Sequence, residues 1–149
     1  MKLLNSLVGG FAGAIALNCI HETARQFIPA APHIHKIGEQ AVVKLTDAGK
    51  IKRPNDNRVY AVALAGDIIS NTIYYSAIGV GPSSKRFTKA ISLGLTAGTA
   101  ALNLTGPMGF DDAPVNRTTE TKVMTVAWYL IGALVTAAVI NSLERVKKF

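Results

Sequence analysis

The sequence predicts an all-α membrane protein whose chain crosses a lipid bilayer four times. Three long stretches contain no charged residue and a fourth contains only Asp67; they are Leu3–Ile20, Ala90–Phe110, Val123–Leu143 and Val59–Ser84. Each reaches the roughly 18–20 residues that a helix needs to cross about 30 Å of hydrocarbon. A soluble bundle helix would carry a charged stripe opposite its apolar stripe, whereas these stretches carry Gly, Ala, Ser and Thr there.

The first crossing is expected over residues 3–27, because Pro29 and Pro32 follow it and proline cannot continue a helix. The connection after it contains a second apolar pattern at helical spacing, formed by Ile34, Ile37, Ala41 and Leu45. Charged side chains occupy the rest of that helical wheel. This pattern predicts an amphipathic helix over residues 34–49 that lies at the membrane surface.

The other three crossings are expected over residues 59–79, 87–106 and 122–143. The Gly81-Pro82 and Gly106-Pro107 pairs end the first two of these. The aromatic residues near the helix ends are expected to form interfacial belts; they are Tyr74, Tyr75, Trp128 and Tyr129. The 149 residues are too few for a second core, so residues 1–149 form a single membrane domain.

The basic residues predict the surroundings of the protein and its orientation. The net charge of +7 is concentrated at the ends of the crossings, where lipid headgroups rather than nucleic acid account for it. Four crossings place seven basic residues on the side of the termini and nine on the other side. The basic residues on the side of the termini lie in short segments close to the helix ends, and such residues have the larger influence on orientation. Both termini are therefore expected in the cytoplasm.

An internal repeat is a further expectation. Gly9, Gly13 and Asn18 align with Gly94, Gly98 and Asn103 when the sequence is shifted by 85 residues. The same shift also aligns Ala12, Ala16 and Leu17 with Ala97, Ala101 and Leu102. A parallel duplication of two helical hairpins would produce this match, and so would the small-residue composition of membrane helices.

Asp67 is the best candidate for a functional site. An Asp at the centre of a membrane helix costs about 2.5–3.5 kcal/mol on insertion scales, so it needs a compensating role or partner. Asn71 and Tyr74 lie on the same face of its helix. From the helical rise, Asn18 and Asn103 fall in the same half of the bilayer, so all could meet in one polar cluster. The cluster would bind an ion or polar ligand, or it would fix helix packing.

The end of the first crossing carries a second group of ionisable residues. Glu22 and Arg25 are spaced to pair, with His21 beside them, as an interfacial pair or as a gate above Asp67. The segment is similar to HExxH, but Arg25 replaces the second histidine and cannot bind zinc. His33 and His35 complete a set of three histidines, yet an extended H-x-H segment would point them apart, so no metal site or cofactor is expected here.

The stretch His21–Arg25 with its following prolines, and Ala65–Asn71, resemble stretches of uncharacterised small four-helix bacterial inner-membrane proteins. The resemblance covers the first two crossings. It implies a bacterial inner membrane and assigns no activity.

Three function classes follow from these observations. The first is a self-associating accessory component, joined to a second copy or a larger complex through the glycine faces around Gly13 and Gly98. The second is permeation or transport of a proton, cation or small polar solute through the cluster around Asp67. A membrane-embedded metal-dependent enzyme is a third and more remote class, because the sequence shows no nucleophile–base pair.

Overall fold

The computed structural model describes residues 2–146, which form an all-helical bundle without strands. The long helices are α1 (Lys2–Phe27), α2 (Ile34–Ala48), α3 (Asp56–Ser76), α4 (Arg86–Asn103) and α6 (Thr119–Val146). Short helical turns complete the chain at η1 (Ala77–Gly79), η2 (Ser83–Lys85) and α5 (Ala113–Asn116). The prediction of an all-α fold is confirmed.

The observed helices begin and end within a few residues of the predicted bounds. Helix α3 begins at Asp56 rather than at residue 59, and α6 begins at Thr119 rather than at residue 122. Helix α4 ends at Asn103, before the predicted glycine stop, and a turn follows it. Gly81 has a φ of 94°, a conformation that glycine adopts easily, and it turns the chain between α3 and α4.

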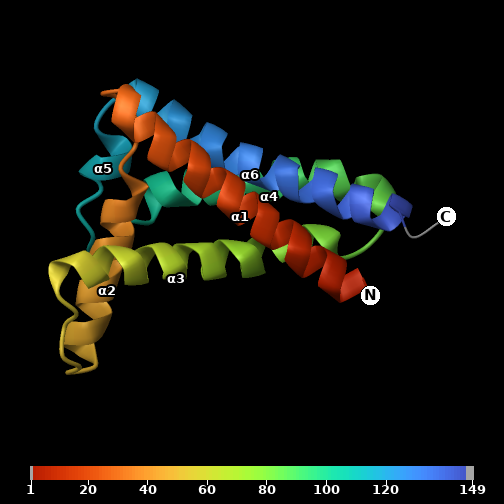
Figure 1. Ribbon diagram of the computed structural model, residues 1–149. Coiled ribbons are helices and arrows are strands. Elements are labelled where there is room, and N and C mark those ends of the chain that lie inside the picture. The colour runs from red at the N-terminus through yellow and green to blue at the C-terminus, as the bar shows by residue number, and fades with distance from the viewer. Residues whose placement is uncertain (1, 147–149) are drawn as a thin grey trace.

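Helices α1, α3, α4 and α6 run along a common long direction, and α2 crosses one end of the bundle (Figure 1). Both described ends of the chain lie at the opposite end of the bundle (Figure 1). Helix α1 packs against α3 on one side and α6 on the other, while α4 packs mainly against α6. The spatial order is therefore α3, α1, α6, α4.

Glycines allow α6 to approach both of its neighbours. A Cβ added at Gly13 would lie 2.4 Å from the carbonyl oxygen of Gly132, and one added at Gly98 would lie 2.7 Å from the Cα of Val126. Both glycine faces are thus filled by α6 of the same chain. In this chain these glycines therefore serve close packing between its own helices.

The aromatic residues are part of the core rather than interfacial belts. Tyr75 is fully buried, and its hydroxyl donates a hydrogen bond to the carbonyl oxygen of Tyr129 at 2.8 Å. Trp128 and Tyr129 pack against the same core. The belt prediction therefore fails for these residues, since small neighbours on α1 and α6 leave room for large rings inside the bundle.

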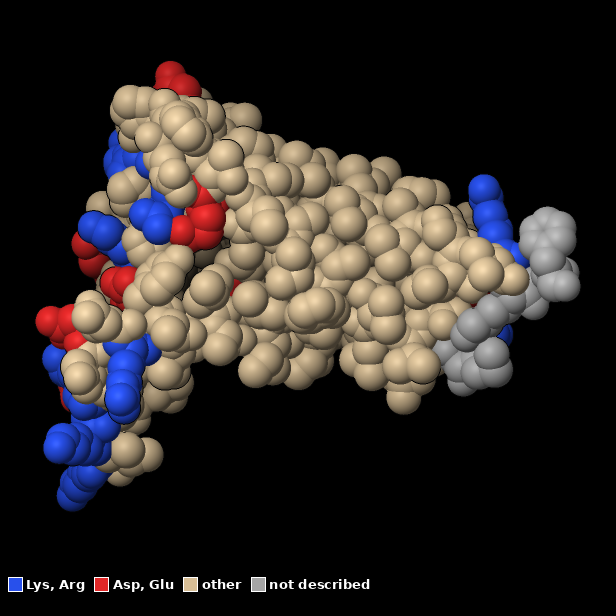
Figure 2. All heavy atoms as spheres, viewed as in Figure 1, with Lys and Arg blue, Asp and Glu red and all other residues tan. Residues whose placement is uncertain are grey.

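Charged side chains gather at the two ends of the molecule and leave a broad band between them without Lys, Arg, Asp or Glu on the face in view (Figure 2). Among residues 2–146, two helices are long and apolar enough to cross a membrane, namely α1 and α6. The predicted crossings through α3 and α4 do not reach that standard by length and composition.

The helix contacts do not confirm the predicted duplication. If α1 and α4 were equivalent, and α3 and α6 likewise, the contact between α1 and α6 would have a counterpart between α3 and α4. Helices α1 and α6 pack extensively, whereas α3 and α4 contact each other only sparsely.

Candidate functional site

Asp67 lies on α3 and receives hydrogen bonds from two amides. Asn18 on α1 donates from Nδ2 to Oδ2 of Asp67 at 2.8 Å, and Asn71 donates from Nδ2 to Oδ1 at 2.9 Å. Asn71 is buried and Asp67 is half-buried. The structure thus brings together three of the predicted site residues from two helices, and each carboxylate oxygen has an amide partner.

The other two residues predicted for this cluster lie elsewhere. The Asn103 amide donates to the carbonyl oxygen of Thr99 in its own helix and is exposed. The Tyr74 hydroxyl donates to the carbonyl oxygen of Leu93 on α4 at 2.9 Å. The prediction that Asn103 and Tyr74 join Asp67 is wrong. Equal depth in the bundle does not determine which neighbour a side chain faces, because this also depends on the rotation of each helix about its axis.

The last turns of α1 hold a second polar group, at the end of the bundle that α2 crosses. The Arg25 guanidinium donates from Nε to Oε2 of Glu22 at 2.8 Å, so the predicted pair is present. The other carboxylate oxygen, Oε1, lies 3.6 Å from Nε2 of His21. His21 itself is only 3% exposed.

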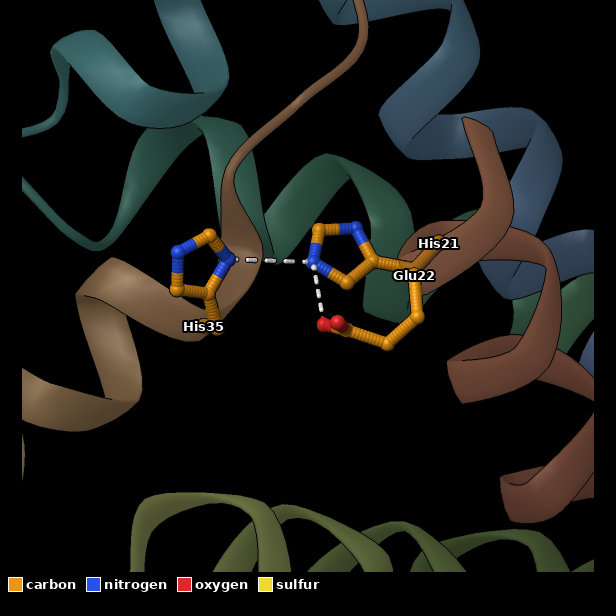
Figure 3. A group of neighbouring side chains, drawn as sticks. All are labelled: His21, Glu22 and His35. Atoms are coloured by element: carbon orange, nitrogen blue, oxygen red, sulfur yellow. Dashed lines mark hydrogen bonds and ion pairs between the residues drawn. The ribbon is translucent and has the colours of Figure 1, made fainter. Parts of the chain in front are cut away.

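His33 and His35 do not diverge as the sequence led us to expect. Helix α2 begins at Ile34, so the H-x-H segment is a helix start rather than an extended loop. The rings of His33 and His35 stack with centroids 5.6 Å apart. Nδ1 of His35 lies 3.4 Å from Nε2 of His21, so α2 carries its histidine onto the end of α1 (Figure 3).

The surroundings of His33 and His35 disfavour the protonated form of both rings. Burial, together with the neighbouring Arg25 cation, lowers the pKa of His35 to about 4. Burial also lowers the pKa of His33, and Arg117 acts in the same direction. A neutral imidazole offers a free nitrogen lone pair, which is the form that binds a metal ion or accepts a proton.

A small cavity connects the two polar groups. It has a volume of about 20 Å³, and its wall includes His21 and His35 at one end and Asn18 and Asp67 at the other. A cavity of roughly 10–15 Å³ is enough for one water molecule. A water molecule or a small ion in this cavity would therefore lie between the histidine pair and the Asp67 carboxylate.

One polar contact was missed in the sequence and lies at the opposite end of the bundle. Arg86, at the start of α4, is 3% exposed and binds the Glu144 carboxylate of α6 through both terminal nitrogens, at 3.0 and 2.8 Å. Asn141 accepts a further hydrogen bond from Arg86. The sequence does show Arg86 shortly before one uncharged stretch and Glu144 directly after another, which is the signal that could have predicted the pair.

No protein-family model, curated protein or solved structure matches this chain.

Proposed function

We propose that this chain is a four-span integral membrane protein of the transport class, with a cation-binding site at Asp67. Its surroundings are lipid, and we place it in a bacterial inner membrane with both termini in the cytoplasm. The observation that carries the proposal is the half-buried Asp67, held by Asn18 and Asn71 and open to a cavity of about 20 Å³.

The surface supports four crossings. Large apolar side chains are exposed on all four long helices of the bundle, as at Phe11, Ile73, Leu95 and Val123. In water this exposure would be unfavourable, whereas in hydrocarbon it carries no penalty. The uncharged band spans the whole bundle between its charged ends on the face shown (Figure 2), and α3 and α4 run along α1 and α6 (Figure 1).

The number of crossings can be tested by cysteine labelling. Cys19 is the single cysteine of the chain, so Cys19→Ser gives a background without cysteine. Lys52→Cys, Lys85→Cys and Asp111→Cys then report on the connections from α2 to α3, from α3 to α4 and from α4 to α6, since all three positions are exposed. Intact cells are treated with a membrane-impermeant maleimide, and permeabilised cells serve as the labelling control.

Four crossings predict that positions 52 and 111 are labelled in intact cells and that position 85 is labelled only after permeabilisation. If α1 and α6 alone cross the bilayer, all three positions lie on one side and label alike. That result would overturn the four-span proposal. Labelling of position 85 alone in intact cells would reverse the orientation and keep the four crossings.

The site geometry favours a carrier over an open pore. The cavity beside Asp67 is lined by residues of α2, which crosses one end of the bundle. Toward the other end, Tyr75 and Ile78 fill the core and are almost completely buried. A cation held at Asp67 would therefore reach the second face only after the helices move, as in alternating access.

Transport is tested in proteoliposomes with imposed gradients of H⁺, Na⁺ or K⁺, each followed separately to identify the cation. We expect flux in the unmodified protein and background flux in Asp67→Asn, which keeps the shape of the side chain and removes its charge. Asp111→Asn is the matched control, because Asp111 is an exposed carboxylate in a loop. Absence of flux for all three cations, or equal flux in Asp67→Asn, would refute the transport function.

A further inference from the structure

Three potential metal ligands converge where α1 ends and α2 begins. Nε2 of His21, Nδ1 of His35 and a carboxylate oxygen of Glu22 all lie within 4.8 Å of one another. Figure 3 shows the two rings and the carboxylate turned toward one point. We propose that His21, Glu22 and His35 form a binding site for a divalent transition-metal ion, a function separate from cation binding at Asp67.

The spacing of the donor atoms suits tetrahedral coordination. Zinc binds histidine nitrogen and carboxylate oxygen at about 2.0–2.2 Å, so two ligands of a tetrahedral site lie about 3.3–3.6 Å apart. The distance from Nε2 of His21 to Nδ1 of His35 is 3.4 Å, and that from the same Nε2 to Oε1 of Glu22 is 3.6 Å. The third separation, between the donor atoms of His35 and Glu22, is at most 4.8 Å, so these two side chains would have to approach each other for one ion to contact all three.

The carboxylate of Glu22 has an unused oxygen on the side of the proposed ion. Oε1 is buried and has no donor at hydrogen-bonding geometry among residues 2–146. Nε2 of His21 lies 3.6 Å from it, and the Tyr60 hydroxyl also interacts with the Glu22 carboxylate. A buried carboxylate oxygen without a donor is unfavourable, and a bound cation would satisfy it. Oε2 already accepts from Arg25, which fixes the orientation of the carboxylate as outer-sphere partners do in metal sites.

The nearby cavity would supply a fourth ligand. The 20 Å³ space touches both His21 and His35, and it has room for one water molecule. Three protein ligands and one water form an open site, in contrast to the closed four-ligand sites that only stabilise a fold. Two imidazoles and a carboxylate suit Zn²⁺, Co²⁺, Ni²⁺ and Fe²⁺ better than Ca²⁺ or Mg²⁺, which prefer oxygen ligands.

The competing explanation is a direct hydrogen bond between the two imidazoles. A separation of 3.4 Å permits a long bond of this kind if one ring donates and the other accepts. A hydrogen bond between His21 and His35 needs no ion, and it leaves Oε1 of Glu22 without a hydrogen-bond donor. The two explanations differ in whether the protein takes up one metal ion with nitrogen and oxygen ligands.

The test uses Co²⁺ as the probe, added to the purified, metal-free full-length protein in detergent. A four- or five-coordinate site gives strong ligand-field absorption, whereas hexa-aquo Co²⁺ absorbs weakly. We expect one equivalent of Co²⁺ to bind, Zn²⁺ to displace it, and the absorption to be lost in His35→Gln and Glu22→Gln. His33→Gln is the matched control, because His33 stacks on His35 but lies outside the group of converging ligands.

Each outcome decides the proposal. Uptake of one Co²⁺ with strong absorption, lost in the two ligand variants and kept in His33→Gln, supports it. No uptake, weak octahedral absorption, or equal loss in His33→Gln overturns it. His35→Gln and Glu22→Gln alter half-buried side chains, and near-ultraviolet circular dichroism verifies their folding. Co²⁺ binding is measured without any flux assay, so failure of transport and failure of metal binding are told apart.

Discussion

The Arg86 guanidinium forms a two-point ion pair with the Glu144 carboxylate and joins the first residue of α4 to the last turn of α6. Arg86 is nearly inaccessible to solvent, so this carboxylate and the Asn141 side chain replace water as partners of its charge. Removing one member of a buried pair leaves an uncompensated charge, which costs about 3–5 kcal/mol.

We therefore expect Glu144→Ala to lower the free energy of unfolding by about 3 kcal/mol, at the lower end because Glu144 is partly exposed. The measurement is thermal unfolding in detergent. Arg145→Ala, one residue further along and exposed, is the control and should change stability little. An equal loss in both variants would show that the pair does not hold α4 on α6.

The glycine contacts predict opposite effects of the same substitution at two positions. Gly13→Ala should destabilise the bundle, because its new methyl group would collide with the backbone oxygen of Gly132. Gly66→Ala should stabilise α3 by up to about 1 kcal/mol, because no atom lies within 4 Å of the added Cβ. Unfolding temperatures of the two variants should move in opposite directions from that of the unmodified protein. A shift of the same sign in both would contradict the close packing of α1 on α6.

The lowered pKa of His35 predicts how stability depends on pH. In the unfolded chain this imidazole binds a proton near pH 6.5, whereas in the folded protein it does so only near pH 4. The unfolded state therefore holds more protons between these values, and the stability contributed by neutral His35 is lost as the pH falls through that window. The ionisable groups facing His35 are His21, Glu22, Arg25, His33, Lys36 and Tyr60.

We expect the unfolding temperature of the metal-free protein to fall between pH 7 and pH 5. His35→Gln, which cannot be protonated, should show a smaller fall. His33 contributes in the same direction, since burial lowers its pKa as well. An identical pH dependence in the variant would mean that His35 is not buried as the structure places it.

The contact between Arg25 and Glu22 gives a prediction about metal affinity. Outer-sphere partners that orient a ligand typically change affinity by about 10–100-fold. Arg25→Gln should therefore weaken Co²⁺ binding by about that factor while leaving one equivalent bound. The measurement is a Co²⁺ titration followed by absorption. Arg53→Gln, at an exposed ion pair with Asp47, serves as the control. Unchanged affinity in Arg25→Gln would show that Glu22 needs no such support.

Much of the fold could be predicted from uncharged stretches and prolines, because these features act locally. The helix over residues 34–49 was predicted from its apolar spacing, and α2 lies within one residue of those bounds. The contact between Asp67 and Asn18 was also expected, since one uncompensated carboxylate needs a partner at its own depth.

The histidine site could not be predicted, because it depends on the angle at which α2 crosses the end of α1. Two residues adjacent on a helix do not normally face each other, yet the flexible Glu22 side chain reaches back to His21. The sequence shows three histidines and a glutamate, but the chain path over Pro29–Pro32 decides which of them meet. His33 and His35 were misjudged for the same reason.

The spatial order of the helices has a consequence for biosynthesis. Helix α4 leaves the ribosome before α6, which fills the glycine face of α4 and supplies the carboxylate for Arg86. Until the last helix is made, Gly94 and Gly98 face no helix of their own chain and the arginine has no counter-ion. Truncation of the final quarter of the chain would therefore leave α4 without its main packing partner, and we expect quality-control proteases to degrade such a product.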